Sequence, residues 1–384
     1  MSRRGNNERG GIDGLLHGLK VLDLSQFIPG PYATRLLCDQ GAEVIKVEPP
    51  QGDPMRRLFY DGEDAMSPVY CALNRGKRIL CIDLKSARGR DMLLELARGA
   101  DVLLESFRPG VMRRLGLDWP ALQSVNRALV YCSLSGYGQH GCYREVAGHD
   151  INYCAAAGLY SSARPPSKPA FAFPPLADHT GAMLATSTIL SALYARARDG
   201  NGRFLDVSIY ESALALRYIG NLRAAGAGIH HADFLGGGAA CYNIYATADA
   251  RFITLGAVEE KFWRAFCAAM REPNWASRQY EEIPQHALIA EVQARFGAEP
   301  LAHWEALLPA ANCCYQSVPL DHEVLRHPQT RDRGLECGND IRYPAWIDGQ
   351  PPAAPIVLRH IDAGAAPGWL SSQTTGTSQC PTKP

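Results

Sequence analysis

The sequence of 384 residues has no net charge and no apolar run long enough to cross a membrane. Basic and acidic residues number 39 each, so no overall field favours nucleic acid or an anionic lipid surface. A membrane span needs about 20 consecutive apolar residues, and the longest stretches here have only the length of core segments. We therefore expect a cytoplasmic protein that binds neither nucleic acid nor membrane, and any anion site must be local.

Cysteine pairs at metal-ligand spacing and a phosphate-binding P-loop are also missing. The 12 cysteines are scattered and Cys313 adjoins Cys314, which suits neither a disulfide framework nor a metal knuckle, and we expect reduced thiols. Adjacent histidines at 230 and 231 lack the spacing that presents ligands to one ion, so we predict no metal site. The G-x-G-x-x-G string at 136–141 does not lead straight into a helix, which favours a plain turn over a dinucleotide site.

What the sequence does contain is an alternation of short apolar runs and helical patterns. Helices of this kind between strands serve as crossovers and cover a parallel sheet on both faces. The fold class predicted is therefore a doubly wound, mostly parallel α/β sheet with a smaller α+β domain. We expect strands at 19–24, 43–47, 79–84, 102–105, 129–133 and 204–208, with helices at 32–40, 87–98, 113–125 and 179–197.

Composition shifts divide the chain into four parts. Residues 1–17 are predicted as a disordered leader, 18–225 as the large domain, 226–320 as the small domain, and 321–384 as a Pro- and Gly-rich closing segment with a disordered tail from Gly368. The glycine-rich stretch 226–238 predicts a mobile linker.

Two basic runs lie beside strands that would be neighbours in the sheet. One is Asn74-Arg75-Gly76-Lys77-Arg78, and the other follows Ser106 and contains Phe107, Arg108, Arg113 and Arg114. A single basic run is commonly only a solvated face. Two such runs at strand ends favour an anion site, because Arg and Lys suit phosphate oxygens and Phe107 offers a face for a base.

Three further residues have both a local and a chemical interpretation. His149 could be a satisfied core or capping histidine, Asp178 an N-cap of the long helix after it, and Glu259 an acid favoured by a helix dipole. Alternatively, the three could be acid/base groups of one site. Local sequence alone leaves these alternatives open.

Seven segments, taken jointly and in order, resemble the family III coenzyme A transferases of the CaiB/BaiF type and their racemase branch, the α-methylacyl-CoA racemases. The segments are 19–24, 29–31, 41–48, 52–56, 74–78, 107–110 and 136–138. The resemblance implies a large coenzyme A-binding domain, a small domain, a closing segment that returns to the large domain, and an interlocked homodimer. It also implies no permanently bound cofactor, since coenzyme A arrives as part of the thioester substrate.

The resemblance assigns roles to particular residues. Coenzyme A contacts would fall on Asn74, Arg75, Lys77, Ser106, Phe107 and Arg114. The aspartate that the transferases use as nucleophile matches Asp178. In the racemases the same aspartate works with a histidine that matches His149, supported by a glutamate that matches Glu259.

Chemistry distinguishes three hypotheses for the function. A racemase of 2-methylacyl-CoA needs two acid/base groups flanking the α-carbon, here His149 and Asp178, and donors for the enolate oxygen, which we place on backbone N–H groups after Asp178. A transferase needs only an ionised Asp178 that attacks the thioester to form an anhydride. The presence of His149 and Glu259 favours the racemase, and an inactive acyl-CoA-binding homologue is the third hypothesis.

The racemase would require Asp178 to hold a proton part of the time. Apolar neighbours such as Leu176 favour the neutral acid, whereas the helix dipole opposes it, and the sequence does not decide between them. The chain also departs from the racemase pattern in four places. His179-Thr180 replaces glycines, Ala240-Cys241 replaces Pro-Phe in the Gly-Gly-Ala-Pro-Phe-Tyr type string at 237–242, Asp249-Ala250 replaces a hairpin Asp-Gly, and the closing helix after about 355 is missing.

Overall fold

The computed structural model describes residues 14–62, 66–160, 170–171, 173–228, 230–351, 354 and 358–360. These form two compact units, one containing the residues up to Leu216 and those from Pro328 onward, the other Arg217–His327. Of the predicted leader, residues 1–13 lie outside the described residues, as does the tail from Gly368. Within the described chain, no helix is both long and apolar enough to cross a membrane.

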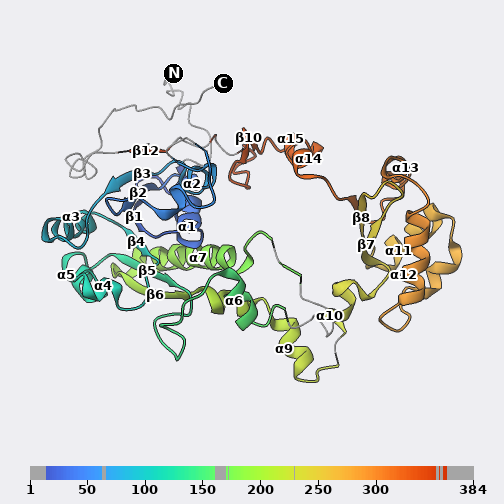
Figure 1. The fold of residues 1–384 in the computed structure, drawn as a ribbon, viewed down its shortest axis with the longest axis horizontal. Helices are drawn as coiled ribbons and strands as arrows, with labels where there is room; N and C mark the ends of the chain where they lie inside the picture. Colours follow the sequence, from blue (N-terminus) through green and yellow to red (C-terminus); the bar gives the residue numbers. More distant parts are fainter. Residues whose placement is uncertain are drawn as a thin grey trace, which may run out of the picture. The chain divides into compact units, whose positions relative to one another are not determined.

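The first unit is built on a seven-stranded parallel sheet in the order β12-β3-β2-β1-β4-β5-β6 (Figure 1). The strands are β1 Lys20–Leu24, β2 Glu43–Glu48, β3 Arg78–Cys81, β4 Val102–Glu105, β5 Val130–Ser135, β6 Arg203–Ser208 and β12 Arg359–His360. The predicted doubly wound α/β class is confirmed.

Helices cover both faces of this sheet. These helices are α1 Pro29–Asp39, α2 Pro68–Asn74, α3 Ala87–Arg98, α4 Val111–Arg114, α5 Trp119–Val125, α6 Asp150–Ala156, α7 Leu176–Asp199 and α8 Ile209–Ala215. The unit also contains α15 Pro328–Asp332 and a short hairpin of β10 Glu336–Cys337 and β11 Asp340–Ile341. Val21 and Leu104 pack with α1 and α7 on one face, whereas Leu22 and Leu103 pack with α3 and the residues around α5 on the other. Strands buried on both faces need continuous apolar runs, which is the pattern the sequence shows.

The order of the strands creates a switch point between β1 and β4. The chain winds from β1 outward through β2 to β3, then crosses to β4 on the other side of β1. The turns that follow β1 and β4 therefore diverge from neighbouring strand ends, and the backbone N–H of Gln26 donates to Ser106 Oγ across them at 3.0 Å. Ligands of doubly wound sheets bind at such a point.

The second unit packs helices against a three-stranded antiparallel sheet. The strands are β7 Tyr242–Ala246, β8 Phe252–Gly256 and β9 Tyr315–Ser317, and the helices are α9 Tyr218–Ala224, α10 His231–Asp233, α11 Glu260–Met270, α12 His286–Phe296, α13 Leu301–Leu307 and α14 Asp321–Val324. Its core contains Trp263, Phe266, Phe296 and Trp304. The turn between β7 and β8 places Ala250 at φ 56°, so the missing hairpin glycine falls at a left-handed position.

The segment predicted as a mobile linker, 226–238, contains helical turns. Residues 231–233 form α10, and Phe234–Gly238 follows as a π-helical turn, with Gly237 at φ 87°. Asp233 also forms an ion pair with Arg223 of α9 at 3.1 Å. The mobility of the segment stays a prediction.

Candidate functional site

The starts of α6 and α7 bring two of the predicted catalytic residues together. His149 is the N-cap of α6, and its backbone N–H donates to Asn152 Oδ1 at 3.1 Å. Asp178 is the third residue of α7, and its N–H donates to Oδ1 of Asp150 at 3.0 Å. Because Asp150 directly follows His149, one hydrogen bond ties the aspartate's helix to the histidine's helix.

The cap interpretation of Asp178 is wrong. Pro175 occupies the N-cap position of α7, and Asp178 is an acidic residue inside the first turn. The capping acceptor is instead Asp150, which is 28 residues away in the sequence.

The environment of Asp178 favours its neutral form. Burial raises the pKa of Asp178 to about 7, and the negative charge of Asp150 adds to this effect. Both influences oppose the helix dipole, which favours the carboxylate. Asp178 can therefore both hold and release a proton near neutral pH, which the sequence left undecided.

Tyr153 of α6 lies near Asp178. Its phenol donates to the backbone carbonyl oxygen of Gly148 at 2.6 Å. Burial, together with the charge of Asp178, raises the pKa of Tyr153 to about 12, while Arg108 acts in the opposite direction. Tyr153 is therefore a neutral phenol that lies within the electrostatic reach of both Asp178 and Arg108.

The side chain of His149 borders the switch point of the sheet. Its exposed ring meets the ring of Phe27 edge to face, with the centroids 6.2 Å apart. Phe27 lies in the turn after β1 and has φ 63°, a conformation that L-residues other than Asn and Asp seldom adopt. The turn after β1 thus contacts Ser106 through Gln26 and His149 through Phe27.

Three of the predicted coenzyme A contacts lie at or near this switch point. Ser106 follows β4 and accepts the N–H of Gln26. Phe107 is half-buried, and Arg114 is exposed at the end of α4, close to Gly110. The structure thus places Ser106 and the catalytic candidate His149 around one turn, as a shared thioester substrate would require.

The other three predicted coenzyme A contacts are buried and already paired. Arg75 binds Asp39 at 2.6 Å and Asp340 at 2.7 Å. Lys77, with no exposed surface, donates to Asp23, Asn74 and the Pro31 carbonyl oxygen at 2.8 to 2.9 Å. Contact of Arg75 and Lys77 with coenzyme A stays a prediction, and it would require both side chains to leave these partners.

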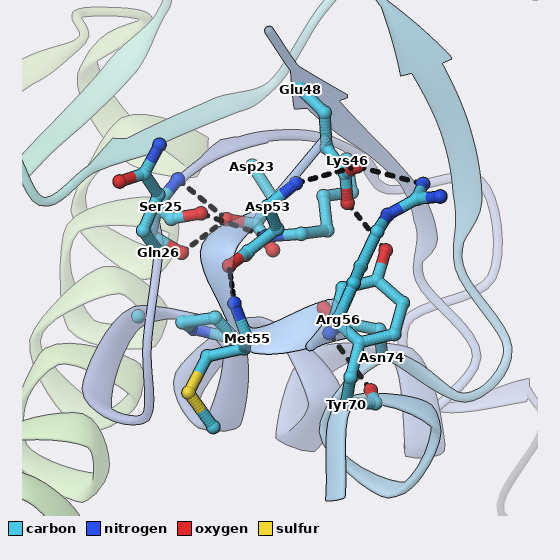
Figure 2. Close-up of polar contacts among 12 residues, drawn as sticks. Asp23, Ser25, Gln26, Lys46, Glu48, Asp53, Met55, Arg56, Tyr70 and Asn74 are labelled. Carbon is cyan, nitrogen blue, oxygen red and sulfur yellow. Dashed lines mark hydrogen bonds and ion pairs between the residues drawn. The ribbon is translucent and has the colours of Figure 1, made fainter. Parts of the chain in front are cut away.

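Figure 2 shows a buried network of charged and polar side chains that includes Asp23, the partner of Lys77. Lys46 reaches between the Ser25 carbonyl oxygen at 2.7 Å and Asp53 at 2.9 Å. Although burial alone would raise the pKa of Asp23, the charges of Lys77 and Lys46 and hydrogen bonds from Ser25 and Thr34 hold it below its usual range. The network fixes the end of β1, from which the turn to Phe27 departs.

Neighbouring contacts extend the network toward the loop after β2. Arg56 binds Glu48 at 2.7 Å, and the phenol of Tyr70 donates to the same carboxylate. The Glu48 carboxylate also accepts the backbone N–H of Asp53 at 3.1 Å. Buried charges are tolerated only when paired and hydrogen-bonded, and here the pairing makes the base of the switch point rigid.

Glu259 belongs to the second unit. It is the N-cap residue of α11, its side chain is exposed, and it makes no capping hydrogen bond. Its predicted support of His149 stays a prediction.

The predicted donors for an enolate oxygen are engaged elsewhere. The N–H of Asp178 binds Asp150, and the N–H of His179 donates to the Pro175 carbonyl oxygen at 3.3 Å. The placement of the oxyanion site on backbone groups at and just after Asp178 is therefore wrong in this structure, because these groups complete the first turn of α7.

Comparison with known proteins identifies the family. The model of CoA-transferase family III matches residues 16–349. The chain belongs to this family. An acyl-CoA transferase of Fusarium pseudograminearum is 33% identical over 84% of the chain and 74% of its own length. The α-methylacyl-CoA racemase of mouse is 32% identical over 91% of each.

Solved structures agree with this assignment. A CaiB/BaiF family protein from Brucella suis has a TM-score of 0.76 and 26% identity, covering 89% of this chain and 96% of that one. The resemblance drawn from the sequence is thereby confirmed. Members of family III with racemase names and with transferase names resemble the chain to a similar degree, so the family assignment does not distinguish a racemase from a transferase.

Sequence reasoning missed Phe27 and Asp150 as members of the site. Asp150 is the residue after His149, and its carboxylate was a visible signal at the start of a helix. Phe27 carried no signal, because its contact with His149 depends on how α6 packs against the turn after β1.

Proposed function

We propose that this family III enzyme racemises 2-methylacyl-CoA thioesters by moving the α-proton between His149 and Asp178. The observation that supports the proposal is the hydrogen bond from the Asp178 N–H to Asp150, which ties the helix start of a carboxyl with a raised pKa to the helix start that carries His149. One group removes the α-proton from one face as the enolate forms, and the other returns a proton to the opposite face.

The raised pKa of Asp178 suits this exchange. A racemase works in both directions, so its two groups must each serve as acid and as base. A carboxyl with a pKa of about 7 can hold a proton and release it near neutral pH, as such a group must. A carboxyl of ordinary pKa would be a poor proton donor at neutral pH.

Coenzyme A transfer through an Asp178 anhydride is the second candidate. It is supported by the similarity to an acyl-CoA transferase over 84% of the chain. This reaction needs the ionised carboxylate as nucleophile. It gives His149 no proton to move.

One experiment separates the candidates. The protein is incubated with a 2-methylacyl-CoA in D₂O, with and without free carboxylic acids, and the thioester is followed by mass and chirality. Deuterium at the α-carbon with loss of chirality supports the racemase, and appearance of coenzyme A on the added acid supports the transferase. Neither change, with coenzyme A still bound, indicates the inactive binding homologue.

His149→Ala tests the role of the histidine. We expect α-deuterium exchange to fall by about 10²–10⁴-fold, the usual contribution of a positioned acid/base group. His17→Ala removes another exposed imidazole of the same unit and should leave exchange unchanged. Exchange at the wild-type rate in His149→Ala would refute the proposed mechanism.

The predicted homodimer is tested separately by light scattering on the purified protein.

A further inference from the structure

Glu105 is a buried carboxylate next to the predicted coenzyme A contacts. It ends β4, is 4% exposed, and lies on the face of the sheet covered by α3 and α5. Among the described residues, no lysine or arginine forms an ion pair with it. A buried carboxylate without a cation is costly unless hydrogen bonds satisfy it, so its partners indicate what it does.

The strongest bond of Glu105 is to the turn that follows it. Its Oε2 accepts the backbone N–H of Phe107 at 2.7 Å. The residue between them, Ser106, is tied by its own side chain to Gln26. The turn Ser106–Phe107 is thus anchored on one side to the end of β4 and on the other to the turn after β1.

Polar side chains lie on the strands next to Glu105. Ser133 is the partner of Glu105 on β5 and acts to lower its pKa, and Ser133 Oγ accepts Gln139 Nε2 at 2.9 Å. The backbone N–H of Gln139 in turn donates to both carboxylate oxygens of Asp206, the partner of Ser133 on β6, each at 3.1 Å. Glu105, Ser133 and Asp206 therefore occupy matching positions of three neighbouring strands, toward the edge at which parallel sheets bind ligands.

Several groups influence the charge on Glu105. Burial raises its pKa to about 7, and Asp206 acts in the same direction, while the bonds from Ser133, Phe107 and Tyr131 oppose it. These three donors are directed at a carboxylate oxygen, which accepts hydrogen bonds best when ionised. The surroundings are thus built to hold an acceptor at this position.

We propose that Glu105 is a positioning residue for coenzyme A, whose carboxylate holds the Ser106–Phe107 turn in the conformation that receives the nucleotide part of the substrate. The inference rests on the proposed function, since it takes Ser106 and Phe107 as coenzyme A contacts. Without Glu105 the N–H of Phe107 loses its acceptor, and the turn is less ordered in the free protein. Part of the binding free energy of coenzyme A is then used to order the turn, which lowers the affinity.

Four proteins test the proposal by titration with free coenzyme A. In Glu105→Leu, which fills the space without an acceptor, we expect the Kd to rise about tenfold, equivalent to about 1.4 kcal/mol. In Glu105→Gln, which keeps an oxygen for the Phe107 N–H, the Kd should stay within about twofold of wild type. Tyr131→Phe removes only a 3.4 Å bond to the same carboxylate and should also leave the Kd nearly unchanged.

The outcomes are separable. A wild-type protein that binds no coenzyme A refutes the proposed function itself. A wild type that binds, with Glu105→Leu binding equally well or with Tyr131→Phe losing as much affinity as Glu105→Leu, refutes only the positioning role. Should Glu105→Leu not fold, Glu105→Asp draws the acceptor back by one methylene from the Phe107 N–H that it binds at 2.7 Å and should weaken binding about threefold, from a modest hydrogen-bond loss. An unchanged Kd in that variant refutes the proposal.

Discussion

The raised pKa of Asp178 can be tested through its neighbour by the substitution Asp150→Asn. An asparagine at 150 keeps a side-chain oxygen that can accept the Asp178 N–H, now at 3.0 Å, so the start of α7 is preserved. The negative charge beside Asp178 is removed. The substitution therefore isolates the electrostatic contribution of Asp150 from its capping contribution.

The size of the effect follows from the causes of the shift. The pKa of Asp178 rises from 3.8 to about 7, and burial is a larger cause than the charge of Asp150. The charge therefore supplies less than half of the rise. Removing it should lower the pKa of Asp178 by about one, to about 6, within the range that a neighbouring charge produces.

The assay is the pH dependence of kcat/KM for α-deuterium exchange, measured across roughly pH 5–9, where it reports the ionisations of the free enzyme. The limb of the profile set by Asp178 should move from about pH 7 toward about pH 6, because a lower pKa extends the ionised form to more acidic conditions. Two-sided proton transfer predicts a bell-shaped profile, whereas a carboxylate nucleophile predicts a rise to a plateau.

Asp150→Glu, which keeps the charge, is the matched control and should leave the limb near pH 7. Asp150→Ala removes both charge and acceptor, so it should move the limb in the same direction and also destabilise the helix start by about 1 kcal/mol. An unmoved limb in Asp150→Asn, or one displaced toward alkaline pH, would show that the charge of Asp150 does not govern Asp178.

Two further predictions concern the scaffold. Lys77→Met leaves the buried Asp23 carboxylate without its closest cation, so urea denaturation should show a loss of about 3–5 kcal/mol, and a loss below about 1 kcal/mol would mean that Lys46 alone compensates Asp23. Ala250→Gly relieves the strain of the left-handed φ of 56° in the β7–β8 turn, so the free energy of unfolding of the second unit should rise by about 1 kcal/mol. A lower free energy of unfolding in the same assay would contradict this prediction.

Local sequence patterns predicted those helices and strands whose bounds are set by residues within or next to them. Helix α3 runs over Ala87–Arg98 as expected, because Ser86 caps it by accepting the N–H of Gly89. Strand β4 matches its prediction since its apolar residues are buried on both faces. The helical region near 113–125 instead divides into α4 and α5, because Gly116 adopts φ 70° between them.

The site was less predictable than the fold because its contacts join distant residues. Arg75 and Lys77 form part of a basic run in the sequence, but their acidic partners Asp340 and Asp23 lie 265 and 54 positions away. A run of like charges in the sequence does not reveal which acidic residues from other parts of the chain will pair with it in the fold. His149 and Asp178 were identified through family resemblance, while the bond that joins their helices depends on the packing of α6 on α7.

The two-piece construction of the first unit has a consequence for how the protein is made. Strands β1 to β6 all lie before Leu216, whereas β12 and Asp340, the partner of Arg75, follow the whole second unit. A nascent chain can thus assemble most of the sheet on the ribosome while the outer side of β3 still lacks its neighbour. An uncovered strand edge invites pairing between chains, and the interval before residues 359–360 emerge is when newly synthesised molecules are most exposed to aggregation.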